Sequence, residues 1–187
     1  MDIVATALRE VLIVVPKRFG DERGFFSEIW NARDFAAAGI DANFVQDNHV
    51  RSALKGTLRG LHYQILPTAQ GKLLRVSRGA IVDVAVDIRR GSPTFGQHAS
   101  AILSADNWRQ LWVPPGFAHG YCTLEDGTEV QYKVTEFYSP WHERGILWND
   151  PALMIEWPVT TSAVIVSDRD RSLPPLAEQP DLFEYGA

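Results

Sequence analysis

The chain has 187 residues, of which 45% are apolar and 22% charged, as expected for one soluble globular domain with a full hydrophobic core. Its formal net charge of −5 argues against a general nucleic-acid binder, which needs a basic surface. Cys122 is the only cysteine, which fits a reducing cytoplasm, and the sequence has neither a signal-peptide pattern nor a membrane-spanning apolar run of roughly 20 residues.

The first third of the chain predicts two strands and one short helix. The strands cover residues 8–16, which end at a proline, and residues 25–30, with a polar turn between them. Asn31 is typical of a helix N-cap, and Gly39 of a helix end, so the helix is expected through residues 34–38.

Chemically active residue types gather in the next part. Gln46 and Asn48 are two residues apart and would lie on the same face of a strand. Both therefore face either a common cavity or a solvated edge, and the sequence favours neither. Two strands joined by a Pro-containing loop follow, from Gly56 to Gly79, and they carry Arg59, His62 and Lys72. These three suit sugar-phosphate chemistry, although a buried or surface histidine and solvated strand ends are the more common explanation of such residues.

The clearest strand covers residues 80–88, with a face of valines and isoleucine opposite Asp83 and Asp87. Because the two aspartates have no histidine nearby in the sequence, we expect them on a polar sheet face. Further strands are predicted over residues 97–103, 110–113 and 117–124.

Asp126-Gly127 predicts a hairpin turn into a strand over residues 129–138, which places Tyr132 and Tyr138 on one face. The Pro-rich tail from Arg171 is expected to be irregular or lightly packed. About ten short strands and little helix predict an all-β sandwich or barrel, with no boundary that would divide the chain.

The sequence excludes several kinds of chemistry. His62-Tyr63-Gln64 lacks the second histidine of a jelly-roll metal site, and Cys122 has no base beside it. No phosphate-binding loop, dinucleotide fingerprint or nucleophile-elbow motif is present. Cofactor-free acid–base chemistry remains, for which His62, an aspartate, Lys72 and Tyr132 are the candidates.

Several segments, in this order and spacing, resemble the dTDP-4-dehydrorhamnose 3,5-epimerase family. They are Asp21-Glu22-Arg23-Gly24-Phe25-Phe26-Ser27-Glu28, Gln46-Asp47-Asn48, Arg59-Gly60-Leu61-His62-Tyr63-Gln64, Gln70-Gly71-Lys72-Leu73, Val84-Ala85-Val86-Asp87-Ile88-Arg89, Pro115-Gly116-Phe117-Ala118-His119-Gly120, Tyr132-Lys133, Trp148-Asn149-Asp150-Pro151 and the Ser167 to Asp170 segment. The resemblance runs from about Val4 to Pro174.

The resemblance implies a cupin-like jelly roll with a few short helices. It implies one domain over residues 1–187, with an irregular tail from about residue 175, that forms a homodimer without nucleic-acid or membrane partners. The implied substrate is dTDP-4-dehydro-6-deoxy-D-glucose, converted in the cytoplasm on the route to dTDP-L-rhamnose, with no cofactor and no metal.

The resemblance also implies roles for individual residues. His62 would remove protons, Asp170 would hold its imidazole, Lys72 would stabilise the enolate, and Tyr132 would return a proton from the opposite face. The positions that match nucleotide and diphosphate binding are Arg23, Glu28, Gln46, Asn48 and Arg59. Phe26 and Tyr138 are candidates for stacking on thymine, and His119 matches a second pocket histidine.

Two alternatives remain at this stage. Relatives with the same motifs epimerise only C3 or only C5, and a non-catalytic sugar-nucleotide binding protein would share the pocket, although it would not need Tyr132. Strict alternation places Arg59 and His62 on opposite faces, so a shared pocket predicts a bulge near Gly60.

Overall fold

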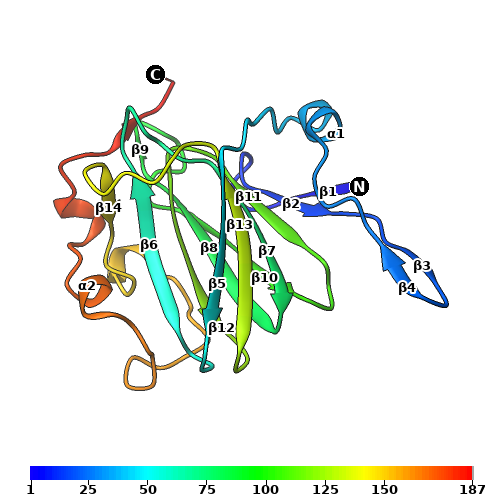
Figure 1. The fold of residues 1–187 in the computed structure, drawn as a ribbon. Coiled ribbons are helices and arrows are strands. Elements are labelled where there is room, and N and C mark those ends of the chain that lie inside the picture. Colours follow the sequence, from blue (N-terminus) through cyan, green and yellow to red (C-terminus); the bar gives the residue numbers. More distant parts are fainter. Residues whose placement is uncertain (187) are drawn as a thin grey trace.

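The computed structural model describes residues 1–186 and contains two main antiparallel sheets packed face to face (Figure 1). The larger sheet has six strands, in the spatial order β1 (Asp2–Ala5), β2 (Leu12–Val15), β11 (Gln110–Val113), β7 (Lys72–Arg78), β13 (Thr128–Val134) and β5 (Gln46–Ser52). The smaller has five, in the order β10 (His98–Ser104), β8 (Ala80–Asp87), β12 (Phe117–Thr123), β6 (Leu58–Gln64) and β14 (Glu143–Gly145).

From β5 to β8, and again from β10 to β13, consecutive strands alternate between the two sheets, which is the connectivity of a jelly roll and confirms the all-β prediction. The Asp126-Gly127 turn therefore does not form a hairpin, and that expectation was wrong. β12 pairs with β6 and β8, whereas β13 pairs with β5 and β7, so the turn carries the chain from one sheet to the other.

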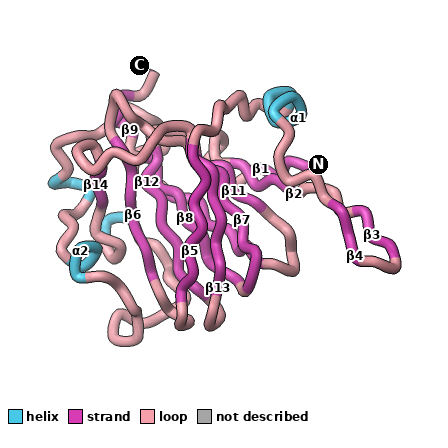
Figure 2. The backbone as a smooth tube through the Cα atoms, in the orientation of Figure 1, coloured by secondary structure: helices cyan, strands magenta, loops and turns pink. Residues whose placement is uncertain are grey.

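The remaining elements are short and lie around the two sheets (Figure 2). β3 (Phe19–Asp21) and β4 (Gly24–Phe26) form a separate hairpin, and β9 (Arg89–Arg90) pairs in parallel with β15 (Phe183–Glu184). The helices are α1 (Ala32–Ala37) and α2 (Asp168–Arg171), with 3₁₀ turns η1 (Pro151–Leu153) and η2 (Leu176–Glu178).

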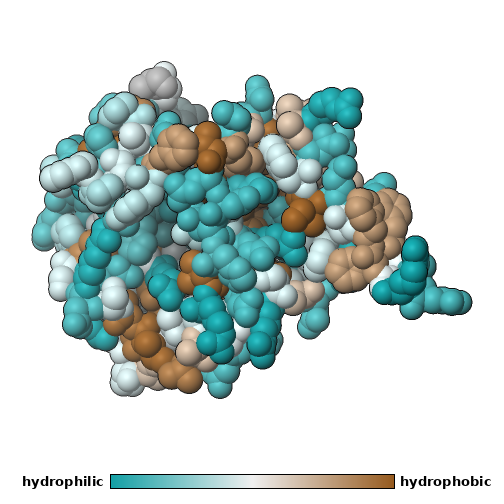
Figure 3. Space-filling model, viewed as in Figure 1, coloured by the Kyte–Doolittle hydropathy of each residue, from teal (hydrophilic) through white to brown (hydrophobic). Residues whose placement is uncertain are grey.

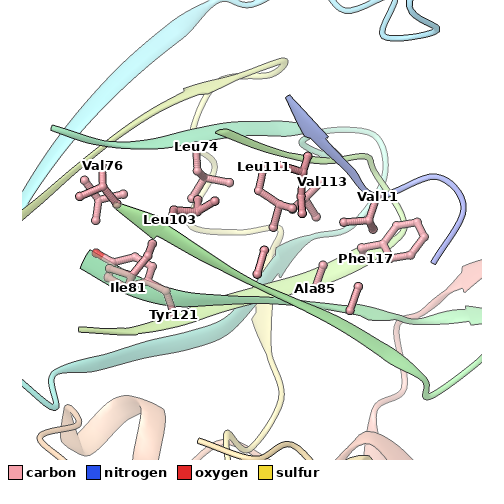
Figure 4. Close-up of a cluster of buried hydrophobic side chains, with 14 of the residues drawn as sticks. Val11, Leu74, Val76, Ile81, Ala85, Leu103, Leu111, Val113, Phe117 and Tyr121 are labelled. Atoms are coloured by element: carbon pink, nitrogen blue, oxygen red, sulfur yellow. The ribbon is translucent and has the colours of Figure 1, made fainter. Parts of the chain in front are cut away.

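The space between the sheets holds the main core. Figure 4 shows Leu74, Leu111 and Val113 from the larger sheet facing Ile81, Ala85 and Phe117 from the smaller one. Burying each of the larger aliphatic side chains contributes about 1.5–3 kcal/mol to the free energy of unfolding. Odd-numbered residues of β8 face this interior, so its orientation is fixed by the packing of Ile81 and Ala85.

Asp83 and Asp87 share the face of Ile81 and Ala85 and are both fully buried, so the prediction of a polar sheet face was wrong. Asp87 is neutralised by Arg89 and accepts hydrogen bonds from the hydroxyls of Ser92 and Thr94. Asp83 accepts a hydrogen bond from a histidine of β12, a partner that is distant in sequence.

The C-terminal segments cover the other face of the smaller sheet. Leu61, Val84 and Val86 pack there against Leu153 and Leu176. The Tyr63 hydroxyl donates to Gln179 Oε1 at 3.1 Å and lies 3.0 Å from the Asp181 carbonyl oxygen. Leu176 and Gln179 are buried, so the expectation of a lightly packed tail is not met for these residues.

The N-terminal third differs from its predicted pattern. The strand expected over residues 8–16 is shorter, β2, and pairs with an unpredicted β1, while residues 25–30 give only the short β4 of the hairpin. The helix and its N-cap are confirmed, because Asn31 Oδ1 accepts from the Arg33 N–H at 3.1 Å and Gly39 follows the helix with φ of +87°. None of the helices within residues 1–186 is long and apolar enough to cross a membrane.

Candidate active site

A cavity of about 470 Å³ opens between the two sheets beside the main core. An adjoining cavity of about 260 Å³ shares His62, Lys72 and Tyr132 with it. These three residues come from β6, β7 and β13, so both sheets contribute walls to the joint cavity. Two polar residues of β5, Gln46 and Asn48, line the smaller part and are hydrogen-bonded to each other at 2.9 Å.

A bulge in β6 brings Arg59 and His62 to the same cavity. His62 lies opposite His119 on β12, whereas Arg59 lies opposite Tyr121, so three steps on β6 match two on β12. Gly60 makes this possible: its φ is +130°, and a Cβ there would lie 2.5 Å from the Gly120 Cα. The irregularity expected near Gly60 is therefore confirmed.

His62 and Asp170 form a hydrogen-bonded pair, with 2.7 Å between His62 Nε2 and Asp170 Oδ1. The other carboxylate oxygen accepts from the Gly60 N–H at 3.2 Å, so the bulge also fixes the aspartate. Ser167 caps α2 and orients Asp170 through its backbone N–H. Although burial acts in the opposite direction, the hydrogen bond from His62 holds the pKa of Asp170 below its ordinary value.

Lys72 extends from β7 across the space between the sheets, and its Nζ donates to the His62 carbonyl at 3.3 Å. Burial lowers the pKa of Lys72 to about 8, and the carboxylates of Asp83 and Glu143 partly offset that effect. A lysine with this pKa is largely charged at neutral pH, and it can stabilise an oxyanion in the cavity.

Tyr132 lies on β13, in the sheet opposite the one that carries His62, and lines both parts of the cavity. Burial raises the pKa of Tyr132, while the nearby Arg59 guanidinium acts against the shift. The phenol therefore stays protonated at neutral pH and is available as a proton donor.

A chain of contacts that the sequence did not predict borders the smaller cavity. The Tyr138 hydroxyl donates to Glu143 Oε2 at 2.8 Å, and the Arg169 guanidinium lies 2.7 Å from the same oxygen. Despite burial, these partners hold the pKa of Glu143 below its ordinary value. Glu143 lies in the Pro- and Trp-rich part of the sequence, where no periodicity marked it as a cavity residue.

His119 also lines the larger cavity and is buried, as is its hydrogen-bond partner Asp83. Burial lowers the pKa of His119, and Asp83 opposes that shift, so the imidazole is neutral at pH 7. The expectation that Asp83 has no histidine partner was wrong, because the partner lies 36 residues away along the chain.

Three predicted binding residues lie outside the cavity. Arg23 and Phe26 are on the β3–β4 hairpin, which projects from the body of the molecule (Figure 1), and Glu28 follows it. Arg23 is bonded to Asp21, and Glu28 accepts from the Asn31 amide at 3.0 Å. Phe26 is 68% exposed, and Figure 3 shows apolar surface on this projection. Neither Arg23, Phe26 nor Glu28 lines the cavity that contains His62.

The cavity contains a base with its orienting carboxylate, an ammonium group and a phenol. Arg59 adds a guanidinium that forms no ion pair within residues 1–186 and can bind an anion bidentately. No group of three or more potential metal ligands occurs among the described residues. The arrangement can move protons next to a carbonyl on an anionic substrate.

Comparison with known proteins identifies the family. A model of the family described as dTDP-4-dehydrorhamnose 3,5-epimerase matches residues 5–178. A Shigella flexneri dTDP-4-dehydrorhamnose 3,5-epimerase is 55% identical over 91% of this chain and 93% of its own.

Two solved structures have the same fold. A Bacillus anthracis epimerase with TDP and PPi bound has a TM-score of 0.90 and 52% identity, over 93% of this chain and 98% of its own. A Legionella pneumophila epimerase in complex with dTDP-4-keto-L-rhamnose has a TM-score of 0.93 and 46% identity, over 100% of this chain and 99% of its own. The fold is thus the predicted cupin-like jelly roll, and the chain belongs to the dTDP-4-dehydrorhamnose 3,5-epimerase family of isomerases.

Proposed function

We propose that this protein epimerises C3 and C5 of dTDP-4-dehydro-6-deoxy-D-glucose and so forms dTDP-4-dehydro-L-rhamnose. The observation that carries the proposal is one cavity that joins the His62–Asp170 pair, Lys72 and Tyr132. The ketone at C4 acidifies the hydrogens on both neighbouring carbons, so one base and one acid are sufficient for both inversions. The sequence of the chain supports the same activity through its close relatives.

The proposed mechanism uses specific atoms for each proton transfer. His62 binds Asp170 through Nε2, which leaves Nδ1 to take the proton from carbon. The electrons of the broken C–H bond form the enolate, whose negative oxygen lies against the Lys72 ammonium. Tyr132 then donates its phenol proton to the opposite face of the carbon, which inverts that centre. Solvent returns a proton to Tyr132 and removes the one on His62 before the next step.

The nucleotide requires a separate set of contacts. Arg59 is proposed to bind the diphosphate, while Gln46, Asn48 and Tyr138 are proposed to contact the nucleoside from the smaller cavity. His119 is proposed to contact the sugar from the cavity wall. Arg23, Phe26 and Glu28 lie on or beside the projecting hairpin, and we propose that they complete the site of a second subunit in a homodimer.

The free, buried thiol of Cys122 suits a reducing compartment, and we propose that the protein acts in the cytoplasm without metal or cofactor. Two other functions would use the same cavity: epimerisation at one carbon only, or binding without catalysis. The Tyr132 phenol, in the sheet opposite His62, favours catalysis over simple binding.

Incubation with dTDP-4-dehydro-6-deoxy-D-glucose in deuterated water tests the proposal. Mass spectrometry and NMR of the product should show deuterium at both C3 and C5, together with inverted configuration at both centres. Label at a single carbon would establish a single-site epimerase, and a lack of label at both carbons would establish a binding protein.

A further inference from the structure

A second His–Asp pair lies in the wall of the cavity, deeper than the first. His119 Nε2 and Asp83 Oδ1 are 2.5 Å apart, and the two side chains are 7% and 0% exposed. In the His62–Asp170 pair, by comparison, the imidazole is 28% exposed. His119 is the cross-strand partner of His62, so the two histidines are neighbours in the smaller sheet.

The second carboxylate oxygen of Asp83 is the unusual feature of this pair. Asp83 Oδ2 is buried and has no hydrogen-bond partner among the described residues. Buried carboxylate oxygens are normally hydrogen-bonded, because an unpaired one loses its hydration without compensation. A compensating positive charge near Asp83 is therefore expected.

Lys72 is the cation that a chain of contacts connects to Asp83. Its Nζ donates to the His62 carbonyl, His62 lies opposite His119, and His119 is bonded to Asp83. Lys72 reaches from β7 toward the sheet that carries Asp83, and it is the only lysine that lines the cavity. The titratable and charged groups around it come from five elements: Arg59 and His62 on β6, Asp83 on β8, His119 and Tyr121 on β12, Tyr132 on β13 and Glu143 on β14. Arg169 and Asp170 of α2 border the same cavity.

The three carboxylates of this set differ in how they are paired. Asp170 is held by His62 and the Gly60 N–H, and Glu143 is held by Arg169 and Tyr138. Among these three carboxylates, only Asp83 has a fully buried oxygen that no donor within residues 1–186 engages. Asp83 therefore has a buried carboxylate oxygen whose negative charge no hydrogen bond stabilises.

We propose that Asp83 is a positioning residue that keeps the Lys72 ammonium charged and directed into the cavity, while its other oxygen fixes the orientation of His119. The inference rests on the proposed function, in which a charged Lys72 stabilises the enolate. Since burial has already lowered the pKa of Lys72 to about 8, the loss of a raising charge would leave much of the lysine neutral at physiological pH.

Direct titration of Lys72 tests the proposal without substrate. The chain has four lysines, at positions 17, 55, 72 and 133, so protein labelled with ¹³C at the lysine Cε gives few signals. Lys72→Arg identifies the Lys72 signal by its disappearance. In Asp83→Asn, we expect the Lys72 midpoint to move to lower pH by roughly one unit.

Asp87→Asn is the matched control. Asp87 is also fully buried on the interior face of β8, but its carboxylate is bonded to Arg89, Ser92 and Thr94. This variant should leave the Lys72 midpoint where it is in the native protein. If Asp83→Asn does not fold, Asp83→Ser replaces it, because the smaller side chain leaves room for a water beside His119. In Asp83→Ser, too, we expect the Lys72 midpoint to move to lower pH. An unchanged Lys72 midpoint in a folded Asp83 variant would overturn the proposal.

The rate of deuterium exchange into substrate, measured against pH, separates this inference from the proposed function. The activity of the native protein should fall as pH rises through the Lys72 pKa, and in Asp83→Asn that fall should begin at lower pH. If the Lys72 midpoint moves and the rate profile does not, Asp83 has the role assigned here, and Lys72 is not the group that stabilises the enolate.

Discussion

Asp170 is proposed to support catalysis through a single hydrogen bond to His62. Asp170→Asn would keep the size of the side chain but replace a carboxylate that accepts from His62 Nε2 with an amide. The wrong tautomer of His62 would then be favoured, and deuterium exchange at both carbons should slow by about 10³–10⁴-fold. Circular dichroism should show a native fold, and exchange within ten-fold of the native rate would contradict the assignment.

Tyr132 should behave differently from His62 and Asp170, because it acts after the proton has left. In Tyr132→Phe, the base remains intact, so deuterium from solvent should still enter the substrate from the His62 side with retention. Inverted product should fall by roughly 100-fold or more, as is typical for loss of a general acid. The measurement is the ratio of washout to inversion, with His62→Ala as the control that should lose both. Equal loss of both in Tyr132→Phe would show that Tyr132 is not the opposite-face acid.

Individual side chains were the part of the site that the sequence predicted best. His62, Lys72 and Tyr132 were identified as candidates from residue type, and the structure brings them to one cavity. Asp83 and Glu143 were missed because nothing local distinguishes a carboxylate that will be buried against a distant strand from one that will be solvated. Their partners lie 36 and 26 residues away along the chain, at His119 and Arg169.

Strand β6 depends on one glycine for its shape. Gly60→Ala would combine a disfavoured φ of +130° with a Cβ 2.5 Å from the Gly120 Cα. The free energy of unfolding should fall by about 3 kcal/mol or more, and exchange activity should be lost because Arg59 and His62 no longer share a face. Urea denaturation measures the first effect, and deuterium exchange the second.

Gly91→Ala separates the two causes. Gly91 has φ of +81°, but a Cβ there would meet nothing within 4 Å, so only the backbone strain remains. Gly91→Ala should lower the free energy of unfolding by about 1 kcal/mol and leave the exchange activity unchanged. If Gly60→Ala were no less stable than Gly91→Ala, the close contact between β6 and β12 would not be what requires glycine.

The whole molecule was less predictable than its strands, since pairing partners are set by tertiary packing. The Asp126-Gly127 turn has the local signal of a hairpin, yet the strands that flank it belong to different sheets. The apolar valine face of β8 was predicted correctly, but no sequence pattern indicated that the opposite face would line the interior between the sheets. The sequence predicts a turn and a strand where the projecting hairpin lies, because short two-stranded elements have little periodicity.

That hairpin carries the last prediction. It exposes Phe19, Phe25 and Phe26, an unusual arrangement unless another surface covers them. Its base is attached to the body, where Phe25 packs on Trp108 at 4.9 Å between ring centroids and Arg18 lies over both rings. A hairpin fixed in this way cannot fold back to the cavity of its own chain without breaking those contacts. If Arg23 and Phe26 bind the nucleotide, they must do so in the second subunit.

Mixing two inactive variants decides between the two placements. One subunit carries His62→Ala with an intact hairpin, and the other carries Arg23→Ala and Phe26→Ala with an intact cavity. If the hairpin serves the partner, each mixed dimer contains one competent site, so random association of equal amounts should restore roughly a quarter of native activity. If the hairpin serves its own chain, neither subunit of the mixed dimer has a complete site, and activity should stay at the level of the separate variants. Sedimentation of the mixture confirms that subunits have exchanged, so an absence of recovery in exchanged dimers would refute a site shared between subunits.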